Sequence, residues 1–152
     1  MYHTVIRQKI TKVFEQLSRG EYEPSLAQIA VGNFEHKFPG NHCLGGTRHT
    51  VDGMRRWFRR LFVLFPRLEF EIKNIFVKGG PVNTLVAVEW IDRGITRDDK
   101  PYDNCGTHIL RLQWGRLVSI HVYLDSQKIA QECQRMTQQG IAEAAAPPIE
   151  DY

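Results

Sequence analysis

The periodicity of the chain changes within one stretch, Phe65-Pro66-Arg67-Leu68-Glu69-Phe70-Glu71-Ile72-Lys73. Before Pro66, apolar residues recur with the spacing of one face of an amphipathic helix. After it, apolar and charged residues alternate, which predicts a β-strand with one buried face. The chain therefore divides into a mainly helical first part and a strand-rich second part.

Three more strand patterns follow this stretch, and turn residues separate them. The polar segment 92–101 reads as a hairpin loop, and Trp114-Gly115 reads as a tight turn. Ser126 is a candidate cap for a last helix, and the segment 140–152 has no core pattern. The strands are predicted at 68–77, 84–91, 102–113 and 116–124.

Three helix patterns and one short strand precede the stretch. The first helix ends at Gly20, the second begins near Pro24, and Thr50 or Asp52 can cap the third. The segment 34–38 alternates apolar and charged residues, which predicts a strand, and a glycine-rich loop spans 39–46. The third helix presents an apolar face made of Met54, Trp57, Phe58, Leu61, Phe62 and Phe65.

Helices followed by strands with short connections predict the α+β class. We expect one cone-shaped, curved antiparallel sheet wrapped over about three N-terminal helices, with a C-terminal helix. The single domain should cover residues 1–139, and 140–152 should form a tail.

Composition supports one globular domain. The chain has 152 residues, of which 42% are hydrophobic and 24% charged, which excludes disordered, collagen-like and disulfide-scaffold classes. No apolar run approaches the roughly 20 residues that span a bilayer. Charged residues interrupt the apolar pattern of the N-terminus, so we expect no signal peptide, no membrane partner and a cytoplasmic location.

The net charge, the cysteines and the histidines indicate which partners and cofactors to expect. The net charge of +3 is too small to require a nucleic-acid partner. Cys43, Cys105 and Cys133 form no Cys-x-x-Cys pair, so reduced thiols are expected. The histidines lack a ligand spacing such as His-x-x-x-His, so the sequence predicts no metal and no other cofactor.

The order and spacing of several motifs resemble the nuclear transport factor 2-like superfamily, and in particular its SnoaL-like branch of polyketide cyclases and ketosteroid-isomerase relatives. The resemblance covers about residues 5–137. Its main carriers are Phe34-Glu35-His36-Lys37-Phe38-Pro39-Gly40, Val51-Asp52-Gly53-Met54-Arg55-Arg56-Trp57-Phe58, and Tyr123-Leu124-Asp125. It implies a cystatin-like cone with a deep pocket and, in many members, dimerisation through the outer sheet face.

Three residues are candidates for acid–base chemistry in such a pocket: His36, His108 and Asp125. Histidine titrates near neutral pH without help, whereas a carboxyl group needs desolvation to do so. Each candidate also has a structural alternative, since the histidines can be hydrogen-bonded core residues and Asp125 can cap the last helix.

The resemblance also marks departures from the isomerase pattern. His36 stands where isomerases carry their base, usually an aspartate. Their first helix supplies a tyrosine as hydrogen-bond donor, but the matching residues here are Val13 and Phe14, which cannot donate. A third position of the isomerases, a protonated acid early in the penultimate long strand, falls near Cys105 to His108. Asp103, Thr107 or His108 could take its place here. Steroid isomerisation is therefore not predicted.

Further residues are expected on the pocket wall or at its rim. Asp92 and Asp103 flank the expected loop, where solvated acids are the simpler interpretation. His121 has the strand parity of Leu117, Ser119 and Tyr123, so it lies on the same face as these residues unless a bulge intervenes. The expected lining residues are Phe14, Phe34, Phe38, Trp57, Trp90, Asp103, His121 and Tyr123.

Two functions from different classes remain open. The first is a cofactor-independent cyclase, isomerase or dehydratase that acts by general acid–base catalysis on a small apolar, polyketide-like carbonyl or hydroxy compound. The second is a non-catalytic ligand-binding or interaction module of the same fold. A homodimer is expected in either case.

Overall fold

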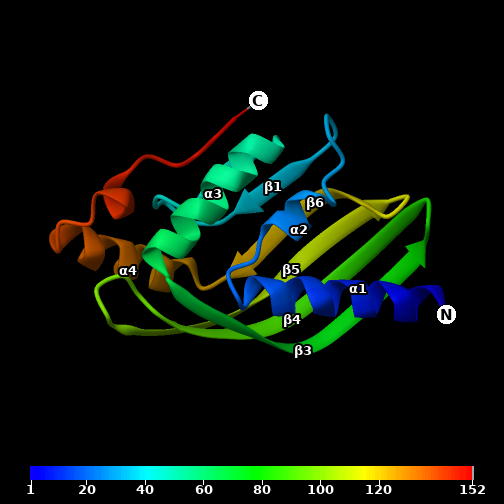
Figure 1. Cartoon of the computed structure of the whole chain (residues 1–152), viewed down its shortest axis with the longest axis horizontal. Helices are drawn as coiled ribbons and strands as arrows, with labels where there is room; N and C mark the ends of the chain where they lie inside the picture. Colours follow the sequence, from blue (N-terminus) through cyan, green and yellow to red (C-terminus); the bar gives the residue numbers. More distant parts are fainter. Residues whose placement is uncertain (152) are drawn as a thin grey trace.

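The computed structural model describes residues 1–151 and contains one open sheet with helices on its inner side (Figure 1). None of the described helices is long and apolar enough to cross a membrane. The elements are α1 (Tyr2–Leu17), α2 (Glu23–Leu26), β1 (Glu35–Phe38), β2 (Gly46–Arg48), α3 (Val51–Leu64), β3 (Arg67–Gly80), β4 (Asn83–Ile95), β5 (Pro101–Gln113), β6 (Arg116–Leu124), α4 (Ser126–Gln138) and the 3₁₀ turn η1 (Ala142–Ala145).

The sheet has six strands in the order β2-β1-β6-β5-β4-β3. The four long strands pair antiparallel, as expected. One pairing departs from the antiparallel pattern, because β1 pairs parallel with β6. The end of the glycine-rich loop also forms a strand that was not predicted, β2, which pairs antiparallel with β1. The α+β class and the curved sheet are confirmed.

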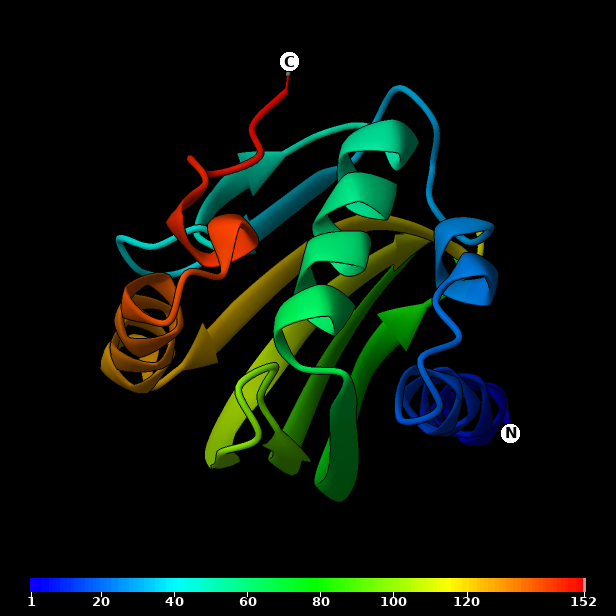
Figure 2. The ribbon, with the colours of Figure 1, turned by 60° about the vertical axis from the view of Figure 1, so that its left-hand side comes forward.

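The helices close the concave side of the sheet. Figure 2 shows α3 lying across this side, with α1 and α2 toward one end and α4 toward the other. Thr50, rather than Asp52, caps α3, since its Oγ1 accepts a hydrogen bond from the Gly53 amide at 2.9 Å. The buried apolar residues of the two long inner helices are Ile6, Ile10, Phe14 and Leu17 of α1 and Met54, Trp57, Phe58, Leu61 and Leu64 of α3.

Strands β4 and β5 both extend into the predicted loop between them. The segment 92–101 was expected to be a loop, but β4 continues to Ile95 and β5 begins at Pro101. The alternation of buried and exposed residues therefore continues past Trp90, and Asp92 is buried on the same face. The interpretation of Asp92 as a solvated rim residue was wrong for this reason.

A β-bulge in β6 changes which face of the sheet its side chains lie on. The pairing with β5 moves from Arg111–Ser119 to Leu112–Leu117, so Val118 is the extra residue. Leu117 is buried before the bulge and Val122 is buried after it, although strict alternation would place them on opposite faces. His121 and Tyr123 therefore lie on the outer face of the sheet.

The C-terminal tail packs closely on the domain. Ala144 and Ile149 are buried, although the tail has no apolar periodicity. The Arg60 guanidinium donates hydrogen bonds to the backbone oxygens of Cys43 and Pro147, both at 2.8 Å. The Asp151 carboxylate accepts from the backbone amide of His49. The tail thus covers the region where α3, β2 and the preceding loop meet.

We expect Ile149→Ala to destabilise the protein by about 2 kcal/mol, because it removes a buried branched side chain. Val31→Ala serves as the control, since Val31 is 86% exposed and its truncation should change stability by less than about 0.5 kcal/mol. Urea unfolding of the two variants and the wild type measures both values. Equal effects of the two substitutions would contradict the packing of the tail.

Candidate functional site

A cavity of about 90 Å³ lies between the concave face of the sheet and helices α1, α2 and α3. This volume holds several water molecules or part of a small ligand. Most of its wall is apolar and much of it aromatic. The aromatic lining residues are Phe14, Phe38, Trp57, Phe58, Phe62, Phe65, Phe70, Trp90 and Tyr102, and the polar ones are Lys9, Ser25, Gln28, His36, Asp92 and His108.

A hydrogen bond from Trp90 determines the chemical state of His108. The indole Nε1–H of Trp90 donates to His108 Nδ1 at 2.7 Å. Because Nδ1 accepts, the proton of the neutral ring is on Nε2. Burial lowers the pKa of His108 to about 4, so the ring is neutral at pH 7. His108 can therefore offer an N–H donor to a ligand without carrying a charge.

The hydrogen bond depends on a glycine in the neighbouring strand. Trp90 pairs with Gly106 of β5. A Cβ atom at Gly106 would lie 2.9 Å from Cζ2 of Trp90 and 2.4 Å from the backbone oxygen of Tyr123. The missing side chain lets the indole lie close to β5, where it reaches His108.

His36 lies on β1 and is almost completely buried, with 2% exposure. Its ring packs edge-on against Trp57 at a centroid distance of 4.7 Å. Burial, and then the charge of Arg48, hold the pKa of His36 well below its ordinary value, so it too is neutral at pH 7. Its Nδ1 has no hydrogen-bond partner among the described residues. A base in this position would have one ring nitrogen available.

His36 and His108 lie at nearby positions in the register of the sheet. His36 pairs with Ile120 of β6, which pairs with Leu110 of β5, two residues from His108. A positive charge on His108 would lower the pKa of His36, so the two rings are close enough to interact. Both residues are on the cavity wall, and one small ligand could contact both.

Asp92 forms a second polar region of the cavity together with Tyr102. Asp92 is 4% exposed and pairs across the strands with Asn104. Burial raises the pKa of Asp92 to about 7, although the backbone amide of Asn104 acts in the opposite direction. Burial also raises the pKa of the Tyr102 phenol, which stays protonated. Asp92 is therefore the buried acid of the cavity that titrates near neutral pH.

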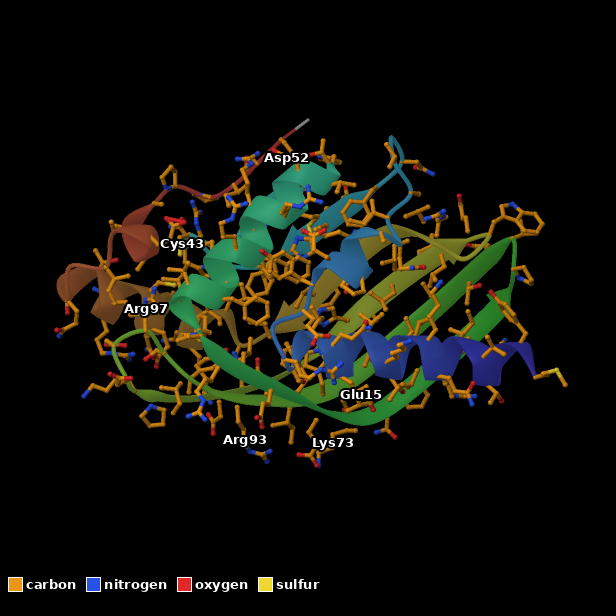
Figure 3. All side chains as sticks on the ribbon, viewed as in Figure 1. Glu15, Cys43, Asp52, Lys73, Arg93 and Arg97 are labelled. Carbon is orange, nitrogen blue, oxygen red and sulfur yellow. The ribbon has the colours of Figure 1, made fainter. Side chains whose placement is uncertain are left out.

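The sequence contained a signal for this residue. Asp92 has the same strand parity as Trp90, and only the assumption that the strand ended at Ile91 removed it from the inner face. Arg93 shows the complementary orientation: in Figure 3 it points away from the helices, as Lys73 does on β3. Its neighbour Asp92 therefore faces inward.

The structure places some of the predicted site residues on the cavity wall and others away from it. Those on the wall come from α1, α3, β1, β4 and β5. They are His36, His108, Phe14, Phe38, Trp57 and Trp90. The other five predicted residues, Asp125, Phe34, Asp103, His121 and Tyr123, lie outside the lining.

Each of the five has a different environment. Asp125 caps α4, since its Oδ1 accepts from the amides of Gln127 and Lys128, so its expected role at the pocket does not match its position. Asp103 lies on the outer side of β5 and binds Lys128 Nζ at 3.0 Å.

The remaining three corrections follow from local backbone geometry. Phe34 precedes β1 and is buried in the core outside the cavity. The β6 bulge turns His121 outward, where its Nε2 lies 2.9 Å from Glu35 Oε1. The same bulge leaves Tyr123 58% exposed.

Within residues 1–151, no group of three or more His, Cys, Asp or Glu side chains is arranged to hold a metal ion. The three cysteines are unpaired. Cys43 and Cys133 are buried with their Sγ atoms 3.6 Å apart, well beyond a disulfide bond length.

Asp92→Asn should stabilise the protein increasingly as pH rises from about 4 to about 7. The folded-state pKa of Asp92 is raised, so the unfolded chain loses this proton first and the wild type loses stability across that interval. The asparagine does not ionise, and the difference in unfolding free energy should grow by up to about 1.4 kcal/mol per pH unit. The negative charge of Asp103 also raises the pKa of this carboxyl, and the positive charge of Lys128 lowers it.

Denaturant unfolding at pH 4.5, 6 and 8 measures this difference. Asp52→Asn is the control, because the Asp52 side chain is 78% exposed and lies outside the cavity lining. A difference between Asp92→Asn and the wild type that is independent of pH would contradict the burial of an ionisable carboxyl at this position.

Comparison with known proteins assigns the fold to a family. The SnoaL-like domain family matches residues 10–120. No curated protein sequence matches the chain.

Solved structures share the fold at low identity. An NTF2-like protein of unknown function from Burkholderia pseudomallei is 18% identical, with a TM-score of 0.71 over 82% of this chain and 94% of that one. PrhC from Penicillium brasilianum is 16% identical, with a TM-score of 0.72 over 88% of each chain. TerC, co-crystallised with polyporic acid, is 13% identical, with a TM-score of 0.66 over 82% of this chain and 94% of that one. The chain belongs to the SnoaL-like domain family of the nuclear transport factor 2-like superfamily.

Proposed function

We propose that the protein binds a small, mainly apolar carbonyl or hydroxy compound and catalyses a cofactor-independent isomerisation, cyclisation or dehydration by general acid–base chemistry. The observation that carries this proposal is the Trp90–His108 hydrogen bond of 2.7 Å, which leaves a neutral imidazole with an Nε2–H donor on the cavity wall. TerC, a protein of similar fold, was crystallised with polyporic acid, which supports an oxygenated ring compound as a ligand class.

In the proposed reaction, the His36 imidazole removes a proton from the carbon next to a ligand carbonyl. The electron pair of the broken C–H bond moves onto the carbonyl oxygen, where the His108 Nε2–H stabilises the developing negative charge. The protonated His36 then returns the proton to another carbon, or to a hydroxyl group that leaves as water. The apolar wall excludes solvent and strengthens the hydrogen bond to the oxygen.

A non-catalytic ligand-binding protein is the second candidate. It is favoured by the first helix, where the apolar ring of Phe14 packs against His108 at a centroid distance of 5.2 Å and supplies no hydroxyl donor. The buried histidines would then serve only to orient a ligand by hydrogen bonds.

We expect His108→Gln to lower kcat/KM about 100-fold on a substrate found by screening hydroxy-ketones and hydroxyquinones for mass-neutral or water-losing conversion. His36→Gln should lower it at least as far, because the base is lost. His3→Gln is the control, since His3 is outside the cavity. Ligand binding with no turnover by the wild type would favour the binding protein instead.

A homodimer through the outer face of the sheet is also proposed. Phe76, Ala87, Ile109 and His121 pair in one row across β3 to β6. Phe76 is 62% exposed on this face. Phe76, Ala87 and Ile109 are the apolar members of this row, and apolar side chains on an open sheet face are typical of a surface that a partner covers. The unpaired thiols support the cytoplasm as the proposed location.

Light scattering at micromolar concentration should give the mass of a dimer for the wild type. Ile109→Asp should convert the protein to a monomer, because two like charges would face each other across the interface. Val31→Asp, at an exposed position outside this row, should leave the mass unchanged. A monomeric wild type would refute the dimer without affecting the catalytic proposal.

A further inference from the structure

The Asp92 carboxyl has a buried oxygen without a partner. Its Oδ1 makes no hydrogen bond within residues 1–151, although the side chain is 96% buried and lies on the cavity wall. Leaving a buried polar atom unpaired costs free energy that a ligand atom can recover. The structure therefore contains an available hydrogen-bonding position at this point of the cavity.

Tyr102 offers a complementary donor beside it. Its hydroxyl accepts a hydrogen bond from Asn104 Nδ2 at 3.0 Å. Asn104 is otherwise engaged, since Nδ2 also donates to the backbone oxygen of Asp125 and Oδ1 accepts from the amide of Cys105. Within residues 1–151 the Tyr102 hydroxyl donates no hydrogen bond. Tyr102 also lines the cavity, so this proton is available to a ligand.

This pair is separated from the histidines. Asp92 is opposite Asn104, and His108 lies four residues further along β5. At the rise of a β-strand this corresponds to roughly 13 Å along the sheet. A ligand that reaches both Asp92 and His108 would therefore contact them with different parts of its structure.

We propose that Asp92 and Tyr102 bind an uncharged hydroxyl group of the ligand, away from the carbonyl that the histidines contact. Only the contact between the histidines and the ligand carbonyl rests on the proposed function. It narrows the substrate class to apolar carbonyl compounds that carry an additional alcohol or phenol.

A hydroxyl fits this pair better than other oxygen groups. It can accept from Tyr102 and either donate to the Asp92 carboxylate or accept from the protonated carboxyl. A ketone can only accept, so it loses one partner when Asp92 ionises. A ligand carboxylate would be repelled by ionised Asp92 and would have to enter an apolar cavity with its charge.

The test compares the affinities of 2-naphthol, 2-tetralone and naphthalene by equilibrium dialysis against the purified full chain at pH 7. The wild type should bind 2-naphthol at least about tenfold more tightly than naphthalene, which corresponds to a hydrogen bond to a buried partner. Asp92→Leu and Tyr102→Phe should each reduce this preference to about threefold or less and leave naphthalene binding unchanged. Asp103→Leu is the matched control and should preserve the preference.

Three results with the wild type would overturn the proposal: equal binding of 2-naphthol and naphthalene, no binding of either, and a preference for 2-tetralone over 2-naphthol. An equal loss of affinity for all probes in Asp92→Leu would also overturn it. His108→Gln is measured alongside and should keep the 2-naphthol preference. If His108→Gln abolishes the preference while Asp92→Leu preserves it, the histidine binds the hydroxyl and the inference is wrong. Failure to find turnover in any screen would affect the proposed catalysis alone.

Discussion

Burial between the curved sheet and helices α1 and α3 sets the protonation of the two histidines and the aspartate of the cavity. Burial is the largest influence on the pKa of His36, His108 and Asp92. It favours the neutral form of each, so it lowers the pKa of the imidazoles and raises that of the carboxyl. At pH 7 both imidazoles are therefore neutral, whereas the Asp92 carboxyl is near the midpoint of its titration.

Local contacts then determine where the His108 proton lies and where the Asp92 carboxyl is placed. The Trp90 indole assigns the His108 proton to Nε2, and Gly106 provides the space that this hydrogen bond needs. The backbone pairing of β4 with β5 sets Asp92 opposite Asn104. These contacts involve neighbouring strands, so the two polar regions are held by the most regular part of the fold.

The opposite edge of the sheet contains a buried charge that the tail helps to balance. Arg48 is fully buried on β2 and donates to the backbone oxygen of Gly45 at 3.0 Å. Burial lowers the pKa of Arg48 to about 10, while the acidic groups of Glu150 and Asp151 act in the opposite direction. The tail thus contributes charge as well as apolar packing to the region beside His36.

Much of the fold could be predicted from the sequence, because helix and strand periodicities are local properties. The change of period after Pro66 established the α+β class, and strand alternation put His108 and Trp90 on the inner face. His36 was placed correctly against the core for the same reason. The aromatic residues of α3 followed from their helical spacing.

The set of residues that line the cavity could not be predicted in full, because it depends on features that no local sequence pattern contains. A single extra residue at Val118 reverses the facing of His121 and Tyr123, and such a bulge depends on pairing with β5. The extension of β4 past Ile91 comes from its pairing with both neighbouring strands, which overrides the polar composition of the segment and buries Asp92. The sequence by itself determined the elements and most of their faces. The tertiary structure decided which polar groups share the cavity, since strand pairing and desolvation arise only when distant segments meet.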